Sequence, residues 1–112
     1  NQIKIMSDRQ DKISKMVRGL VAEYIARESN STNLITVTNV EVSPDAKYGK
    51  IFITVLPIKD EEKAIEFLKR KRKDIHEYLK KNMRTRPIPF IDVMIDVGEK
   101  HRQRIDELSV GL

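Results

Sequence analysis

Residues 34–56 read LITVTNVEVSPDAKYGKIFITVL, and they form the clearest structural pattern in this chain of 112 residues. Apolar and polar residues alternate along both ends of the stretch, which is typical of half-buried strands. Between the two ends lies SPDAK, residues 43–47, a run of residue types that favour a turn. The pattern therefore predicts two antiparallel strands, 34–43 and 48–56, joined as a hairpin.

The alternation changes phase inside the first predicted strand. Ile35 and Val37 share one phase, whereas Val40 and Val42 share the other. Because successive side chains on a strand point to opposite faces, all four can reach one core only if an extra residue is inserted. We therefore predict a β-bulge near positions 38–39.

A first helix is predicted before the hairpin. Ser7 and Gln10 have the spacing of a capping box, so the helix begins at Ser7 and ends in the polar run 28–33. Its apolar residues recur every three or four positions, which places them on one face: Ile13, Met16, Val17, Leu20, Val21, Tyr24 and Ile25.

A second helix is predicted after the hairpin, with Asp60 as its N-terminal cap. One face of this helix is apolar and carries Ala64, Leu68, Ile75 and Leu79. Between Leu68 and Ile75 the pattern fails, because an unbroken helix would place Lys71 within the buried arc. Either Lys71 extends its ammonium group out to solvent, or the helix kinks within residues 69–73, and we favour the kink.

A third strand completes the pattern. Two prolines in residues 85–89 end the second helix and favour an extended chain, after which residues 90–96 alternate again. Gly98 ends this strand, and residues 99–108 form an optional last helix. The order helix, strand, strand, helix, strand predicts an α+β fold in which a three-stranded sheet has its helices packed on one face.

The composition suits one small domain, residues 1–112, with an ordered core of about 7–108. Hydrophobic residues make up 39% of the chain and charged residues 35%, and no apolar run is long enough to cross a membrane. The chain has no Cys, which excludes disulfides, thiol nucleophiles and thiolate metal sites. The composition, together with the absence of a secretion signal at the start, favours the cytoplasm.

The positive charge is concentrated in residues 63–86. This segment holds ten Lys and Arg against three Asp and Glu, a net charge of +7, whereas the whole chain carries +5. A basic segment on an otherwise near-neutral body is typical of a protein that binds polyanions. On an unbroken helix, one arc beside the apolar face contains no acid and holds Lys69, Lys73, His76, Lys80 and Arg84. We expect this arc to contact phosphates.

The neighbouring arc of the same helix has a structural explanation. There Arg70 with Asp74, and Glu77 with Lys81, have the spacing of opposite-charge pairs. These residues are therefore predicted to form a self-paired, solvated face.

Residues that could support catalysis are few. His76 lies in the basic segment with no acid positioned to orient it, and His101 lies among charged residues with no second histidine for a metal. Asp92 and Asp96 share a face of the third strand about 13 Å apart, which exceeds the reach of an acid/base pair. We therefore predict no enzyme activity, no metal site and no cofactor.

Base stacking is not expected from the aromatic residues. The chain has three Tyr and three Phe and no Trp, and Phe52 and Tyr48 are expected to serve the core or the turn. Recognition should therefore depend on the backbone and the shape of the nucleic acid.

At this point the residues show a family resemblance. VTNVEVSPD at 37–45 and KYGKIFITV at 47–55 resemble the hairpin signature of the ribosome-binding factor A family. The resemblance spans about residues 7–108 and continues through the first helix and through the pattern of a basic helix exit, a proline and a last strand that ends in Asp. The family usually has Ala-x-Gly at its helix kink, whereas residues 71–73 here read KRK.

The resemblance implies a type II KH-like fold with a kinked second helix. It also implies a non-enzymatic bacterial factor that binds the small ribosomal subunit during late assembly, supports maturation of the subunit RNA, and helps at low temperature. Alternatives from other classes are a basic protein–protein interaction module and a general KH-like RNA binder without a ribosomal role. We expect a monomer with no small-molecule substrate and no membrane partner. The predicted RNA-binding residues are Lys47, Lys50, Lys69, Arg70, Lys71, Arg72, Lys73, His76, Lys80, Lys81, Arg84 and Arg86.

Overall fold

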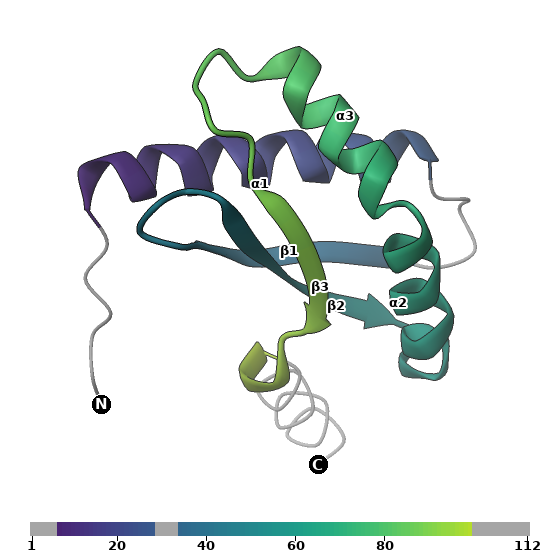
Figure 1. The fold of residues 1–112 in the computed structure, drawn as a ribbon. Coiled ribbons are helices and arrows are strands. Elements are labelled where there is room, and N and C mark those ends of the chain that lie inside the picture. The colour runs from purple at the N-terminus through teal and green to yellow at the C-terminus, as the bar shows by residue number, and fades with distance from the viewer. Residues whose placement is uncertain (1–6, 29–33, 100–112) are drawn as a thin grey trace.

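A computed structural model describes residues 7–28 and 34–99 of the chain (Figure 1). The described elements follow the predicted order, except that the second predicted helix is divided into α2 and α3 and is preceded by one turn of 3-10 helix, η1. The elements are α1 (Asp8–Glu28), β1 (Leu34–Val42), β2 (Tyr48–Leu56), η1 (Ile58–Asp60), α2 (Glu61–Arg70), α3 (Arg72–Asn82) and β3 (Phe90–Ile95).

The three strands form one sheet in the order β1-β2-β3. Strand β1 pairs with β2 in antiparallel fashion, as the hairpin pattern predicts. Strand β3 pairs with β2 in parallel, so the chain between them must cross over the sheet, and α2 and α3 form this crossover. The predicted α+β fold is confirmed.

The predicted β-bulge is also confirmed. The register shifts between Val37, which faces Ile53, and Asn39, which faces Phe52. The extra residue is Thr38. Its hydroxyl group is within hydrogen-bond distance of the Phe52 carbonyl oxygen, at 3.2 Å, and of a carboxylate oxygen of Asp96, at 2.5 Å. The shift turns the later apolar residues of β1 toward the same core as the earlier ones.

The helices cover one face of the sheet. In Figure 1, α1 runs across the molecule beside β1, and α3 crosses α1. The strand residues that are buried beneath the helices are Val37, Val40, Val42, Ile51, Ile53, Val55, Ile91 and Val93. On the opposite face of the sheet most side chains are exposed or half-buried, with Thr54 buried, and we call it the open face. Its residues include Glu41, Tyr48, Lys50, Phe52, Phe90, Asp92 and Met94.

The start of α1 has the predicted capping box. The Ser7 N–H donates to the side-chain oxygen of Gln10 at 3.0 Å, and the Gln10 N–H donates to the Ser7 hydroxyl at 3.1 Å. The predicted apolar face of this helix packs against β1 and α3, with Ile13, Val17, Val21, Tyr24 and Ile25 buried.

The second predicted helix is divided by a kink at Lys71, as favoured from the pattern. Helix α2 ends at Arg70 and α3 begins at Arg72, while Lys71 has φ −94° and ψ 5°. The Lys71 N–H is shared between the carbonyl oxygens of Phe67 and Leu68, at 3.2 and 3.1 Å. No Gly or Pro is needed, because the φ of Lys71 is negative and accessible to any residue.

Asp60 occupies the N-cap position of α2, as predicted, but its side chain does not cap the helix. Asp60 ends η1 with φ −92° and ψ 3°, and its side chain makes no capping hydrogen bond. An N-cap normally has an extended backbone that aims its side chain at the first helical N–H groups, and Asp60 lacks that conformation. Glu61 and Glu62 do lie in the first turn of α2, where the helix dipole favours acids.

The C-terminal part of the chain is described only in part. A helical turn begins at residues 97–99, and the Asp96 carboxylate at its start accepts the Glu99 N–H at 3.0 Å. The rest of the predicted last helix, with His101, lies outside the described residues. Within the described residues, none of the helices has the length and apolar content needed to span a membrane.

A buried tyrosine connects α1 to α3. The Tyr24 hydroxyl donates to the Asp74 carboxylate, and the Tyr24 ring meets the Tyr78 ring edge to face, with 5.6 Å between centroids. Only 3% of Tyr24 is exposed. Burial, reinforced by the Asp74 carboxylate, raises the pKa of Tyr24 above its ordinary value.

Replacing Tyr24 with Phe is expected to change how stability depends on alkaline pH. In the unfolded chain Tyr24 titrates near its ordinary pKa of 10.0, whereas the folded protein keeps the proton to higher pH. Above pH 10.0 the unfolded state therefore binds fewer protons, and the free energy of unfolding falls as pH rises.

Urea denaturation of wild type and Tyr24→Phe over a pH series measures this effect. The difference in free energy of unfolding should be constant below the ordinary tyrosine pKa and should shrink above it, because the variant lacks the titrating group. A difference that stays constant into strongly alkaline solution would contradict the buried contact.

Candidate nucleic-acid interface

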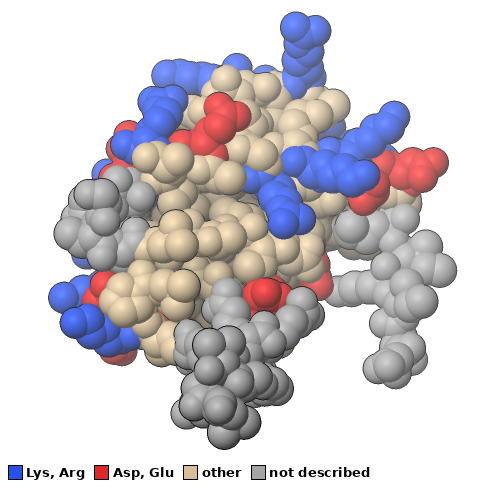
Figure 2. Space-filling view, turned by 180° about the vertical axis from the view of Figure 1, so that it is seen from behind, with Lys and Arg blue, Asp and Glu red and all other residues tan. Residues whose placement is uncertain are grey.

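All of the predicted RNA-binding side chains reach the surface. Ten of the twelve residues are exposed, and Lys71 and His76 are half-buried. They come from the hairpin, the end of α2, the kink, α3 and the loop that follows α3. Figure 2 shows a broad uncharged surface on one side of the molecule, with most Lys and Arg side chains toward its upper and right-hand margins.

The kink divides the basic segment between two helices. The single arc predicted from Lys69 to Arg84 assumed 100° per residue, but Lys71 does not have helical geometry and Arg84 lies beyond the end of α3. The arc of an unbroken helix is therefore wrong. The basic side chains instead form a surface that bends with the chain, which we call the basic surface: Lys69, Arg70, Lys71, Arg72, Lys73, Lys80, Lys81, Arg84 and Arg86.

The predicted pairs on the neighbouring arc are also absent from the described residues. Arg70 and Asp74 lie on opposite sides of the kink, and Asp74 accepts the Tyr24 hydroxyl. Glu77 and Lys81 both lie exposed on α3 without an ion pair between them in the described part of the chain. Fewer ion pairs therefore neutralise the positive charge of α3 than the i, i+4 spacing predicted.

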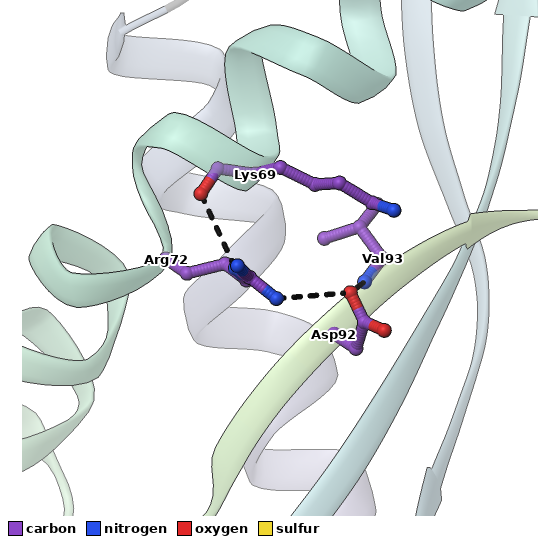
Figure 3. Close-up of polar contacts among 4 residues, drawn as sticks. All are labelled: Lys69, Arg72, Asp92 and Val93. Carbon is purple, nitrogen blue, oxygen red and sulfur yellow. Dashed lines mark hydrogen bonds and ion pairs between the residues drawn. The ribbon is translucent and has the colours of Figure 1, made fainter.

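Arg72 ties the kink to the edge of the sheet (Figure 3). Its Nε donates to the Lys69 carbonyl oxygen at 3.2 Å, and its terminal nitrogen lies 3.4 Å from a carboxylate oxygen of Asp92 on β3. The same oxygen accepts the Val93 N–H at 2.9 Å, which orients the carboxylate. Both charged side chains are half exposed, so this pair positions the guanidinium group while leaving it accessible to solvent.

Arg86 holds the loop that follows α3. One of its terminal nitrogens donates to the carbonyl oxygens of Met83 and Thr85, each at 3.0 Å. Its own carbonyl oxygen accepts a hydrogen bond from the Arg9 guanidinium at 3.1 Å, which joins the loop to the start of α1. Arg84 and Arg86 are both exposed, but Arg86 in addition has a structural role that sequence reasoning missed.

His76 supports an aromatic ring. Its imidazole stacks on Phe90 with 4.4 Å between centroids and 1° between planes, and its Nε2 lies 3.4 Å from the Ile88 carbonyl oxygen. The first residue of β3, Phe90, is 61% exposed and was not among the predicted site residues. Its signal in the sequence is weak: an aromatic residue out of phase with the buried Ile91 and Val93.

The hairpin turn is ordered by its own polar groups. The Asp45 carboxylate accepts the Ser43 hydroxyl at 2.6 Å and the Lys47 N–H at 3.1 Å, and these bonds lower the pKa of Asp45. The side chains of Lys47 and Lys50 are exposed on either side of Tyr48. Tyr48 directly follows the turn, as expected, but Phe52 is only half-buried and lies on the open face, outside the core.

The two carboxylates of the third strand serve different partners. Asp92 pairs with Arg72, whereas Asp96 bonds to Thr38 and the Glu99 N–H. In residues 7–28 and 34–99, no group of three or more His, Asp or Glu side chains is arranged to hold a metal ion.

Comparisons with known proteins agree with the fold described above. The family model described as Ribosome-binding factor A matches residues 9–109. The chain is 30% identical over 105 residues to ribosome-binding factor A of Thermomicrobium roseum, covering 91% of this chain and 81% of that protein.

Solved structures share the fold. The crystal structure of ribosome-binding factor A from Thermus thermophilus superposes with a TM-score of 0.69 at 21% identity, covering 77% of this chain and 94% of that one. A homology model of the Thermus thermophilus factor, fitted into a cryo-EM map of its complex with the 30S subunit, superposes with a TM-score of 0.64 at 22% identity, covering 72% of this chain and 88% of that one. Since the family match extends over nearly all of the sequence, the chain belongs to the ribosome-binding factor A family.

Proposed function

We propose that this protein is a ribosome assembly factor that binds the small ribosomal subunit and its RNA during late assembly and RNA maturation. It acts by binding, without catalysis or a cofactor, as a cytoplasmic monomer with a KH-like fold, and it supports growth in the cold. Membership of the family supports this role, as does the relative from Thermus thermophilus, whose coordinates were fitted into a complex with the 30S subunit.

The observation that carries the proposal is the basic surface. Lys69, Lys73 and Lys80 are exposed, and their ammonium groups have no ion pair among the described residues. Lys and Arg that neutralise RNA phosphates release bound counterions, so they contribute affinity that depends on salt. The two helices on either side of the kink point in different directions (Figure 1), which lets one basic surface follow a curved RNA backbone.

Cosedimentation across a salt series tests this function. The protein is mixed in parallel with isolated small subunits, large subunits and free duplex RNA. We expect retention on small subunits alone near physiological salt, and stronger retention on precursor subunits with unprocessed RNA ends than on mature ones. Nonspecific electrostatic binding would instead weaken steeply as salt rises, and retention would be the same on all three partners.

Two results would contradict the proposal. If rising salt removes the protein equally from all three partners, the basic surface binds polyanions without selecting the small subunit. Retention that survives digestion of the RNA and follows an acidic protein would favour the protein–protein interaction module.

A further inference from the structure

The open face of the sheet is hollowed at its hairpin end. The cavity has a volume of about 500 Å³. The open-face residues that line it come from all three strands: Glu41, Tyr48, Lys50, Phe90 and Asp92; Ser43 of the hairpin turn also lines it. Gln10 of α1 and the buried residues Val42 and Ile91 also line it, so the hollow reaches the margin of the core.

Two aromatic residues stand beside each other in this hollow. Tyr48 and Phe90 are direct partners across the β2–β3 ladder, which places their backbones one strand spacing apart. Tyr48 is 62% exposed, so both rings present much of their surface to solvent. Large exposed apolar side chains that gather at one place mark a binding surface more often than single ones do.

The Phe90 ring is held in place from one side only. It stacks in parallel on His76, whereas no ring contact joins it to Tyr48 in the described structure. His76 is itself anchored near the Ile88 carbonyl oxygen. A flat ring placed in the hollow could therefore continue the existing stack against aromatic side chains that are already positioned.

Side chains of both positive and negative charge surround the hollow. Lys50 lies across the ladders from Glu41 on one side and Asp92 on the other, and Arg72 reaches Asp92 from the kink. Carboxylates accept hydrogen bonds from the amino and imino groups at the edge of a nucleobase, and the cations suit the phosphate attached to it. Arg72 also belongs to the basic surface, so the hollow adjoins the region proposed to bind RNA phosphates.

We propose that this hollow binds an unpaired nucleobase of single-stranded RNA, stacked against Phe90 and Tyr48. A base in a duplex has both faces covered by its neighbours, so the site selects single strands, which the basic surface alone does not. The inference rests on the proposed function only in that the ligand is RNA. It reverses the expectation from sequence that recognition depends on backbone and shape alone.

Removing one ring tests the site. We expect Tyr48→Ala to lower affinity for a short single-stranded oligoadenylate about 10-fold, a typical loss for one base–aromatic stack, and to leave affinity for a duplex of the same length unchanged. Tyr48→Phe should retain binding, because stacking needs the ring and not the hydroxyl. Leu34→Ala is the matched control, since Leu34 is 60% exposed at the opposite end of β1.

A second measurement reports on the ring directly. The chain has no Trp, so Tyr48→Trp introduces a single indole fluorophore at the site. Oligoadenylate should quench its fluorescence, while an RNA of equal length with abasic sites, which keeps the phosphates, should not. Circular dichroism of each variant confirms that the fold is retained.

The outcomes separate this inference from the proposed function. Unchanged oligoadenylate binding by Tyr48→Ala, together with unquenched fluorescence of the Tyr48→Trp variant, would overturn the base site, while cosedimentation of the wild-type protein would still decide the ribosomal role. If Tyr48→Ala weakens binding to small subunits but not to oligoadenylate, the hollow receives a protein side chain and the inference is wrong.

Discussion

Reversing the charge of Lys69, Lys73 and Lys80 to Glu is expected to abolish retention on small ribosomal subunits near physiological salt. All three side chains are exposed, one on α2 and two on α3, on both sides of the kink. Losing three phosphate contacts should reduce the slope of log affinity against log salt by about two to three, and the new carboxylates add repulsion. Cosedimentation across the salt series measures both effects.

The fold should survive this change, because none of the three side chains is buried or paired in the described structure. The matched control replaces Lys12, Lys15 and Lys59 with Glu, which changes the net charge equally at exposed positions outside the basic surface. If both triple variants lose binding to the same extent, the overall charge matters and the position of the basic surface does not.

Truncating Ile75 to Ala is expected to cause the largest loss of stability. Ile75 is 0% exposed and lies in the first turns of α3, where the kink at Lys71 turns it toward the sheet. Removing this much of a buried side chain loses the transfer free energy of the missing carbons and leaves a cavity, together about 2–5 kcal/mol. That is a large share of the total stability of a small domain, which is about 5–15 kcal/mol.

Urea denaturation measures this loss as a lower midpoint with an unchanged slope. Ile58→Ala is the control, since Ile58 lies exposed in η1 and its truncation should change the free energy of unfolding by at most about 0.5 kcal/mol. Similar losses in the two variants would show that the kink does not direct Ile75 into the core.

Local patterns predicted the elements closely. The strands differ from their predicted ranges by at most one residue, and the bulge followed from a change of phase within β1. The kink followed from the failure of the helical period at Lys71. These features depend on a few consecutive residues, because side chains alternate along a strand and recur every three to four residues along a helix.

The candidate site could be predicted only in part. The net charge of residues 63–86 is a property of composition, so the exposed basic residues could be named in advance. Their arrangement could not, because the helical arc was extended through the kink and beyond the end of α3. Asp60 holds the predicted N-cap position, but its side chain makes no capping hydrogen bond, because that bond depends on a backbone conformation that residue type alone does not fix.

Contacts between distant residues came only from the folded chain. Arg72 meets Asp92 from 20 residues away, Tyr24 meets Asp74 from 50, and Tyr48 and Phe90 become neighbours only because β3 pairs with β2. No spacing rule connects such pairs in the sequence. Periodicity and composition therefore determined the elements, the core face and the sign of the surface. The hollow on the open face and the position of each cation arose from strand pairing and helix packing, which bring together residues that no local interaction links.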